Sequence, residues 1–341
     1  MDSKIKIAIL DTGININHED LSNYIVGGIS FMKKNNRYEI SEKYMDDNGH
    51  GTLCASVIKK ECSNVEFFII KVLDKNASGN LEVLECALNY LKQSDIRLIN
   101  MSFALIGKTN LKDLKKICKE LEKENKILIC SLANGYNKSY PAVFKSVLGV
   151  RGFILENEKS YWFCKNKKIQ AVVDYNEYLH CNIKNTYSLF GVCNSFAAAK
   201  MTGIVAGIMY SNPNITKNQL YKKLREECTK KWWSKSDFKI KKHYPSFMVE
   251  SVLKYDWVIK KLEYVLGEYF KINDLSILKK YILFSEKIGL NKDRCYDLLK
   301  LIENKFEIKF KDYTKFSVDD FCSIYTLSAL IINELSIKES N

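Results

Sequence analysis

The first two thirds of the chain alternate between short apolar runs and longer segments with apolar residues at helical spacing. The apolar runs have the length of buried strands, which we expect at residues 5–10, 65–72, 97–101, 127–130, 146–150 and 169–173. Helices are expected between them, at residues 53–60, 81–91 and 111–124. Strands that alternate with helices predict an α/β fold, in which a parallel sheet carries helices on both faces.

A run of small and apolar residues follows Ser195 and extends to Gly207. It predicts a buried helix with Ser195 in its first turn. Free backbone N–H groups and the positive end of the helix dipole lie at such a position, where they can stabilise an oxyanion. A serine there can also be an ordinary N-cap of a core helix, which for one serine alone is the more frequent role.

Three further polar residues stand where predicted strands or helices end or begin. Asp11 ends the first strand, His50 lies between two glycines near the start of a helix, and Asn134 follows the fourth strand. Parallel sheets place their sites at the carboxyl ends of strands. A histidine can act as a general base near neutral pH, and an asparagine amide can donate to an oxyanion. Taken alone, Asp11 fits a turn-forming aspartate at least as well, and a lone histidine is more often structural.

From about residue 252 the apolar spacing becomes helical, and we expect helices at residues 275–287, 294–306 and 318–335. The segment at residues 229–255 is basic and contains Trp232 and Trp233. It is either a linker packed by its tryptophans or a substrate-docking surface. The predicted domains are residues 1–228, a connector at 229–255 and a small all-α domain at 256–341.

Composition narrows the classes of partner and compartment. The chain has 341 residues, 46% of them hydrophobic, and a net charge of +13. Its lysines are spread along the whole sequence, which favours a solvated basic surface over a nucleic-acid partner. The eleven cysteines are unclustered, which is typical of a reducing compartment. The sequence has no signal-peptide pattern and no apolar run of about 18 residues, so we expect a cytoplasmic protein without a membrane span.

Five segments resemble, in the same order, the motifs of one enzyme family. They are residues 7–13, 48–52, 100–103, 132–134 together with 140–142, and 195–203. The order of the aspartate, the histidine and the serine is that of subtilisin. Over about residues 4–225 the chain therefore resembles a subtilisin-like serine peptidase (subtilase, S8-type).

The resemblance implies a role for each residue. Ser195 would attack the scissile carbonyl, His50 would accept the serine proton, and Asp11 would orient the imidazole. Asn134 and the backbone N–H of Ser195 would bind the oxyanion. An extended substrate would pair with two edges of the cleft, which comprise Ser78, Gly79, Ser102, Phe103 and Ala104.

Some residues depart from the family pattern. Cys193 and Asn194 stand where the family usually has Gly-Thr, and Ala199 stands where it usually has proline. Leu53 replaces the second histidine of the histidine motif, and Ala104 replaces a cleft glycine, so its methyl group narrows the S1 side. None of these changes removes a catalytic atom. They affect the shape of the cleft and the substrate range more than the chemistry.

The predicted function is that of an intracellular serine endopeptidase that matures a specific peptide or protein, for example by removing the leader of a modified peptide. Two alternatives use the same scaffold: a non-catalytic peptide-binding protein, and an acyl-enzyme ligase or macrocyclase. We expect no cofactor and no metal. The sequence contains no C-x-x-C pair for zinc and no dense Asp/Asn loop for calcium.

Residues 260–337 resemble the four-helix fold of acyl or peptidyl carriers. Lys292 occupies the position where carriers have the serine that takes phosphopantetheine, so no prosthetic arm is expected there. Such a module would bind a protein partner or the substrate. A generic helical bundle accounts for the same pattern.

Overall fold

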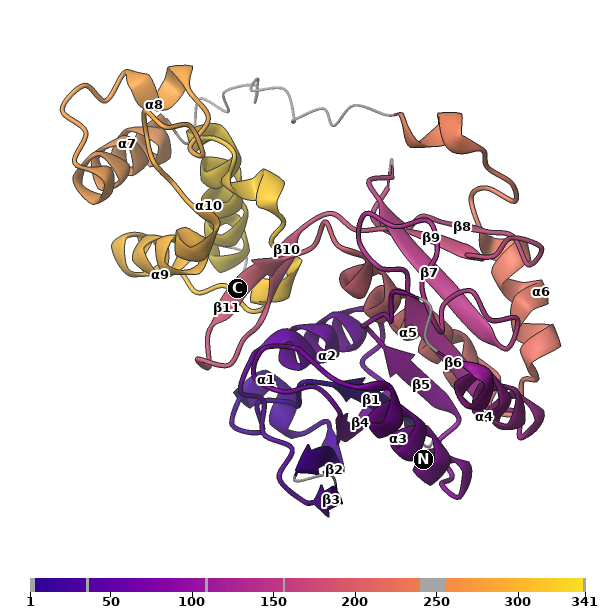
Figure 1. The fold of residues 1–341 in the computed structure, drawn as a ribbon. Coiled ribbons are helices and arrows are strands. Elements are labelled where there is room, and N and C mark those ends of the chain that lie inside the picture. The colour runs from indigo at the N-terminus through magenta and orange to yellow at the C-terminus, as the bar shows by residue number, and fades with distance from the viewer. Residues whose placement is uncertain (1–3, 35–36, 108–109, 156, 240–255, 340–341) are drawn as a thin grey trace. The chain divides into compact units, whose positions relative to one another are not determined.

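The computed structural model describes residues 4–34, 37–107, 110–155, 157–239 and 256–339. The chain divides into two compact units, coloured along the sequence in Figure 1. The sheet unit comprises residues 1–176, 181–186 and 191–240, and the helical unit comprises residues 177–180, 187–190 and 241–341. Among the described helices, none has both the length and the apolar character needed to cross a membrane.

Nine strands of the described residues form the central sheet of the sheet unit. They are β1 Ile5–Asp11, β2 Ile25–Lys34, β3 Arg37–Ser41, β4 Val65–Lys71, β5 Leu98–Met101, β6 Ile127–Ser131, β7 Val147–Phe153, β8 Tyr161–Phe163 and β9 Ala171–Asp174. Their order is β3-β2-β4-β1-β5-β6-β7-β9-β8. Neighbours from β2 to β9 are parallel, and β3 and β8 add an antiparallel strand at each edge. The predicted α/β fold with a parallel sheet is confirmed.

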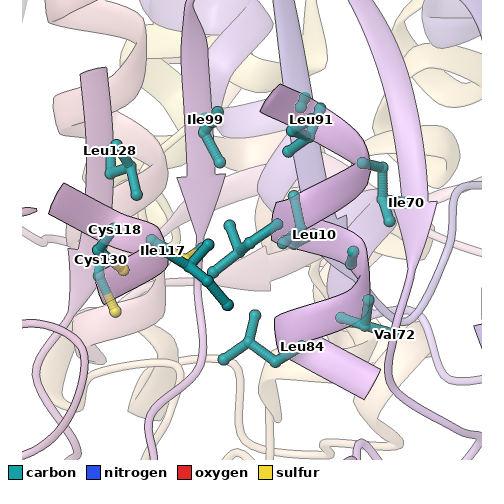
Figure 2. Close-up of a cluster of buried hydrophobic side chains, with 14 of the residues drawn as sticks. Leu10, Ile70, Val72, Leu84, Leu91, Ile99, Ile117, Cys118, Leu128 and Cys130 are labelled. Atoms are coloured by element: carbon teal, nitrogen blue, oxygen red, sulfur yellow. The ribbon is translucent and has the colours of Figure 1, made fainter. Parts of the chain in front are cut away.

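Helices cover both faces of this sheet. On one face, α3 (Leu81–Lys92) and α4 (Lys112–Lys123) bury apolar side chains against the strands, as Figure 2 shows. The cluster includes Leu10, Ile70, Ile99 and Leu128 from strands, and Leu84, Leu91, Ile117 and Cys118 from helices. On the other face, α2 (His50–Glu61) and α5 (Asn194–Ser211) pack against each other and against the sheet.

Helix α5 is buried along most of its length because many of its residues are small. A Cβ atom at Gly203 would lie 2.4 Å from Cβ of Glu61 and 3.0 Å from the carbonyl oxygen of Ile58, both in α2. A glycine therefore permits this close approach of two helices. The predicted buried helix is confirmed, and Ser195 is its second residue, after the N-cap Cys193.

Helix α6 (Lys217–Glu227) and the described part of the connector also belong to the sheet unit. The N–H of Thr229 donates to the carbonyl of Tyr161 over 2.9 Å, and Trp233 is buried against Trp162. Residues 229–239 thus pack on the sheet unit, which extends to residue 240. The rest of the connector, residues 240–255, lies outside the described residues.

The helical unit contains a hairpin from the middle of the sequence. Its elements are β10 Tyr178–Cys181, β11 Tyr187–Phe190, α7 Asp256–Phe270, α8 Ile277–Lys280, α9 Cys295–Phe306 and α10 Ile324–Glu339. The N–H of Leu179 donates to the carbonyl of Phe316, and the N–H of Val318 donates to the carbonyl of Glu177, each over 2.9 Å. The expected domain at residues 256–341 omitted these strands.

The predicted helices of this unit have mixed outcomes. The helix expected at 294–306 is confirmed as α9. The one expected at 275–287 is wrong, since only residues 277–280 are α-helical and the N–H of Leu283 donates instead to the carbonyl of Cys322. The helix expected at 318–335 is split, because the Ser323 hydroxyl accepts the N–H of Thr326 over 3.1 Å at the start of α10.

Candidate active site

Strand β1 and helix α2 bring Asp11 and His50 together. Asp11 is the last residue of β1 and fully buried, whereas His50 is the first residue of α2 and has 23% of its side chain exposed. Nδ1 of His50 lies 2.7 Å from Oδ1 of Asp11, and the same oxygen accepts the N–H of Thr12. The contact assigns the proton to Nδ1, so Nε2 is the nitrogen that can accept a proton from another group.

The surroundings of His50 favour its protonated form. Burial alone lowers the pKa of His50, but the Asp11 carboxylate outweighs this effect and the pKa is raised well above its usual value. One turn along α2, Sγ of Cys54 lies 4.0 Å from Nδ1 of His50. Burial raises the pKa of this thiol, which also contacts the side chain of Ser102. The His50 imidazole therefore loses its proton, and can act as a base, only at a higher pH than an ordinary histidine.

Asp46 holds the loop before α2, although it was not among the predicted site residues. Its Oδ1 accepts the N–H of Gly49 and the hydroxyl of Thr12, each over 2.8 Å. Its Oδ2 accepts the N–H of Thr52 over 3.0 Å and the Thr52 hydroxyl over 2.6 Å. Burial raises the pKa of Asp46, but these donors hold it below its usual value. An aspartate shortly before Asn-Gly and a helix start was the sequence signal for this role.

Ser195 is tied to the end of β5. Its hydroxyl donates to the carbonyl of Ser102 over 2.8 Å, and the Ser102 hydroxyl donates back to the carbonyl of Ser195 over 3.3 Å. The side chain of Asn100 donates to the Ser102 hydroxyl over 3.0 Å and accepts the hydroxyl of Thr202, one to two turns further along α5. This network fixes the first turn of α5 against β5, with Ser195 half-buried.

Asn134 is held by the residue before Ser195. Its Oδ1 accepts the N–H of Asn194 over 2.9 Å, and the side chain of Asn194 accepts the N–H of Gly152 over 2.8 Å. Since the oxygen of the Asn134 amide is engaged, its NH₂ group is the end that can donate to an approaching oxyanion. Asn134 itself is exposed, so a substrate can reach it.

Most of the predicted substrate-binding residues line one cavity of about 230 Å³. These residues are Ser78, Gly79, Phe103 and Ala104. Ser102 contacts Ser195 instead. The neighbouring Leu105 is fixed by two backbone hydrogen bonds with Tyr140, of 2.8 and 3.0 Å.

The contacts connect the predicted residues at one edge of the sheet. His50 contacts Cys54, Cys54 contacts Ser102, and the Ser102 carbonyl holds the Ser195 hydroxyl. A hydroxyl, an imidazole oriented by a carboxylate and an amide donor are the groups that acyl transfer needs.

Three side chains at this edge could also present metal ligands. The ligand atoms of Asp11, His50 and Cys54 lie within 4.8 Å of one another. The first two are already hydrogen-bonded to each other, which suits a catalytic pair as well as a metal site. That the site works without a metal stays a prediction.

Comparison with known proteins bears on the sheet unit. The sequence model of the Subtilase family matches residues 2–240. The major intracellular serine protease of Bacillus subtilis (strain 168) is 31% identical over 220 residues, which are 59% of this chain and 67% of that protein. Subtilisin DY of Bacillus licheniformis is 25% identical over 244 residues, 67% of this chain and 84% of that protein. An intracellular serine protease of Paenibacillus polymyxa is 25% identical over 218 residues, 59% of this chain and 65% of that protein.

Proposed function

Because the chain belongs to the subtilase family and is a serine endopeptidase, we propose that Ser195 is its nucleophile, His50 its general base and Asp11 the carboxylate that orients His50. The observation that carries this proposal is the 2.7 Å contact between Nδ1 of His50 and Oδ1 of Asp11. It leaves Nε2 to exchange protons with the nucleophile and the leaving group.

The reaction begins when the Ser195 hydroxyl turns away from the Ser102 carbonyl towards His50. Oγ bonds to the scissile carbonyl carbon while its proton passes to Nε2 of His50. The Asp11 carboxylate stabilises the imidazolium. The C–N bond then breaks as His50 gives that proton to the leaving amine. A water molecule attacks the acyl-enzyme, gives one proton to His50, and Ser195 recovers it when the acid product leaves.

The oxyanion of each tetrahedral intermediate is bound by two donors. One is the NH₂ group of Asn134, which is oriented because Asn194 engages its oxygen. The other is the backbone N–H of Ser195, at the positive end of the α5 dipole. The Asn134 side chain is held by Asn194 and the Ser195 N–H belongs to α5, so both donors need little rearrangement when the charge develops.

The substrate chain extends along residues 102–104 and 78–79, with its backbone paired as an added strand. The cavity beside these segments is lined by apolar residues such as Leu73, Leu84 and Phe103, and its volume of about 230 Å³ suits one apolar substrate side chain. A Cβ atom at Gly79 would lie 2.7 Å from Cδ2 of Leu73 and 2.9 Å from the Val72 carbonyl oxygen. Gly79→Ala should therefore weaken selection for a large apolar side chain.

We place the enzyme in the cytoplasm, where it matures a specific peptide or protein. Two relatives are named intracellular serine proteases. All eleven cysteines lie in the described part of the chain, and no disulfide joins any of them there. The helical unit would supply a docking surface for the substrate or a partner. Lys292 pairs with Glu177 over 2.7 Å, which gives this position a structural role in place of a prosthetic group.

The proposal is tested with an active-site fluorophosphonate probe. The wild-type chain should be labelled, and Ser195→Ala should not. Ser211→Ala, the same substitution at the other end of α5, is the matched control and should be labelled like the wild type. Labelling of Ser195→Ala would place the nucleophile elsewhere.

Incubation with a peptide library, followed by mass analysis of the products, then distinguishes the possible reactions of the acyl-enzyme. Product masses that show cleavage, absent in Ser195→Ala, support hydrolysis. Masses of joined or cyclic peptides would assign the ligase reaction instead. Peptide binding without turnover, equal in both forms, would leave only a binding scaffold.

A further inference from the structure

A cavity lined by lysines lies at the edge of the sheet opposite the candidate active site. Its volume is about 660 Å³, and its charged lining comprises Lys145, Lys165, Lys167, Lys168, Lys217 and a single carboxylate, Glu122. Pockets for small ligands usually have volumes of about 300–1,000 Å³. The size and the shared sign of the charges suit a small anion.

The position of the cavity follows from the topology. Residue 145 precedes β7, and residues 165–168 precede β9, so the lysines stand at the amino ends of two parallel strands. Asp11 instead ends its strand in the same sheet. Helix α6 begins with Lys217, and the positive end of its dipole adds to the charge of the lining.

The positive charge of the cavity is only partly neutralised. Nζ of Lys217 binds the Glu122 carboxylate and donates to the carbonyl of Ser146 over 3.0 Å. Burial lowers the pKa of Lys217, the Glu122 contact opposes this, and the nearby Lys165 lowers it further. Within the lining, the other four lysines face no second carboxylate. Like charges held close together repel one another, and a bound anion relieves this repulsion.

A buried hydroxyl in the lining also lacks a partner. Tyr221 is 5% exposed and contributes to the cavity wall. Among the described residues, its hydroxyl has no hydrogen-bond partner. A buried polar atom without a partner is costly, and a water or ligand that reached this hydroxyl would satisfy it.

We propose that this cavity binds a small anion that carries several phosphate groups. Lysine ammonium groups act as compact point charges for phosphate oxygens. Lys145, Lys165 and Lys168 face no carboxylate in the lining, whereas Nζ of Lys167 lies 4.0 Å from the centroid of the Trp232 ring. Their combined charge matches that of an oligophosphate better than that of a single carboxylate. The volume of about 660 Å³ suits a short phosphate chain, either free or as part of a nucleotide.

The test is calorimetric titration of the full chain with inorganic tripolyphosphate at near-physiological salt. We expect one site per chain, and at least a tenfold loss of affinity in the double variant Lys165→Ala/Lys168→Ala. The matched control is Lys43→Ala/Lys112→Ala, which removes the same charge from exposed positions outside the cavity and should bind within twofold of the wild type. Thermal melts establish that both variants are folded. Equal binding of adenosine triphosphate would show that the phosphate chain alone is recognised, and tighter binding would add a contact for the nucleoside.

Three results would overturn the proposal. They are an absence of saturable binding, an equal loss of affinity in the two double variants, and equally tight binding of a hexaglutamate peptide. The second would assign the effect to the general basic surface, and the third would make carboxylates the recognised groups. Each can be read without peptidase activity, so the proposed catalytic role is tested separately.

Discussion

The two edges of the central sheet differ in how their charged side chains are paired. At the carboxyl edge, the buried carboxylates of Asp11 and Asp46 are bound by nearby donors of β1, α2 and the loop between them. At the amino edge, a single carboxylate, Glu122, faces five lysines. The first edge is organised before any substrate arrives, which is what catalysis by fixed groups requires. The second is left with excess charge, which is what a site for a charged ligand requires.

The largest expected effect comes from substituting Asp11, the carboxylate at the centre of the candidate active site. Asp11→Asn keeps the shape of the side chain but removes the negative charge and favours the wrong tautomer of His50. In serine peptidases with this arrangement the turnover falls by about 10⁴-fold, and we expect the same order here from kinetics with a peptide ester. Asp113→Asn, on the exposed face of α4, is the control and should be unchanged. A loss below tenfold for Asp11→Asn would remove Asp11 from the mechanism.

Asn134→Leu should have the next largest effect. Leucine has a similar volume but no N–H group for the oxyanion, and loss of such a donor in subtilisin lowers kcat by about 10²–10³-fold. The KM should change little, because the donor acts mainly on the transition state. A rise in KM with unchanged kcat would instead make Asn134 a residue of substrate binding. Steady-state kinetics on one short peptide distinguish the two.

The pH dependence of kcat/KM tests the effect of Asp11 on His50 in a second way. The Asp11 carboxylate raises the pKa of His50 against the effect of burial, so the imidazole keeps its proton, and cannot accept the Ser195 proton, up to a higher pH than an ordinary histidine. We expect kcat/KM to rise about tenfold per pH unit up to a pKa above the usual value of about 6.5. The stability that this proton gives the fold is complete below about pH 6.5 and is lost as the pH rises through the folded-state pKa. A flat rate profile between pH 6 and pH 9 would contradict this assignment.

The site residues at the carboxyl edge could be predicted from the sequence because each stands in a recognisable local pattern. Asp11 ends an apolar run, and His50 lies between glycines at a helix start. Asp46 was missed although it stands shortly before Asn-Gly and a helix start, because its bond to the Thr12 hydroxyl forms only after β1 and α2 have packed. The sequence pattern therefore predicts which residues form the site better than which residues support them.

The fold was predictable where strands are buried on both faces, and less so elsewhere. Strands β2 and β3 were missed because glycines and lysines interrupt their apolar pattern, and β8 is only three residues long. Residues 275–287 have helical spacing, but Leu278 and Leu283 are buried by short turns and by pairing with Cys322. Spacing alone does not distinguish a helix from a folded loop that buries the same side chains.

The smallest expected effect concerns the stability of the amino edge. Lys165→Ala/Lys168→Ala removes two like charges from the lysine cavity, so their repulsion is relieved while one contact of 3.4 Å between Lys165 and Asn218 is lost. The two effects nearly cancel, and we expect the free energy of unfolding to change by about 0.5 kcal/mol or less.

The salt dependence of the melting temperature makes this small effect measurable. At about 0.1 M salt, repulsion between exposed charges more than about 10 Å apart is largely screened. Repulsion over shorter distances is screened less. Between about 0.02 and 0.5 M sodium chloride, a salt that binds no phosphate site tightly, the wild type should therefore gain more stability than the variant. The variant should also keep kcat within twofold of the wild type, because the candidate active site lies at the other edge. If the melting temperatures of the two proteins rose equally with salt, the lysines would not repel one another. The two edges would then differ only in that the carboxylates of the carboxyl edge are held by donors.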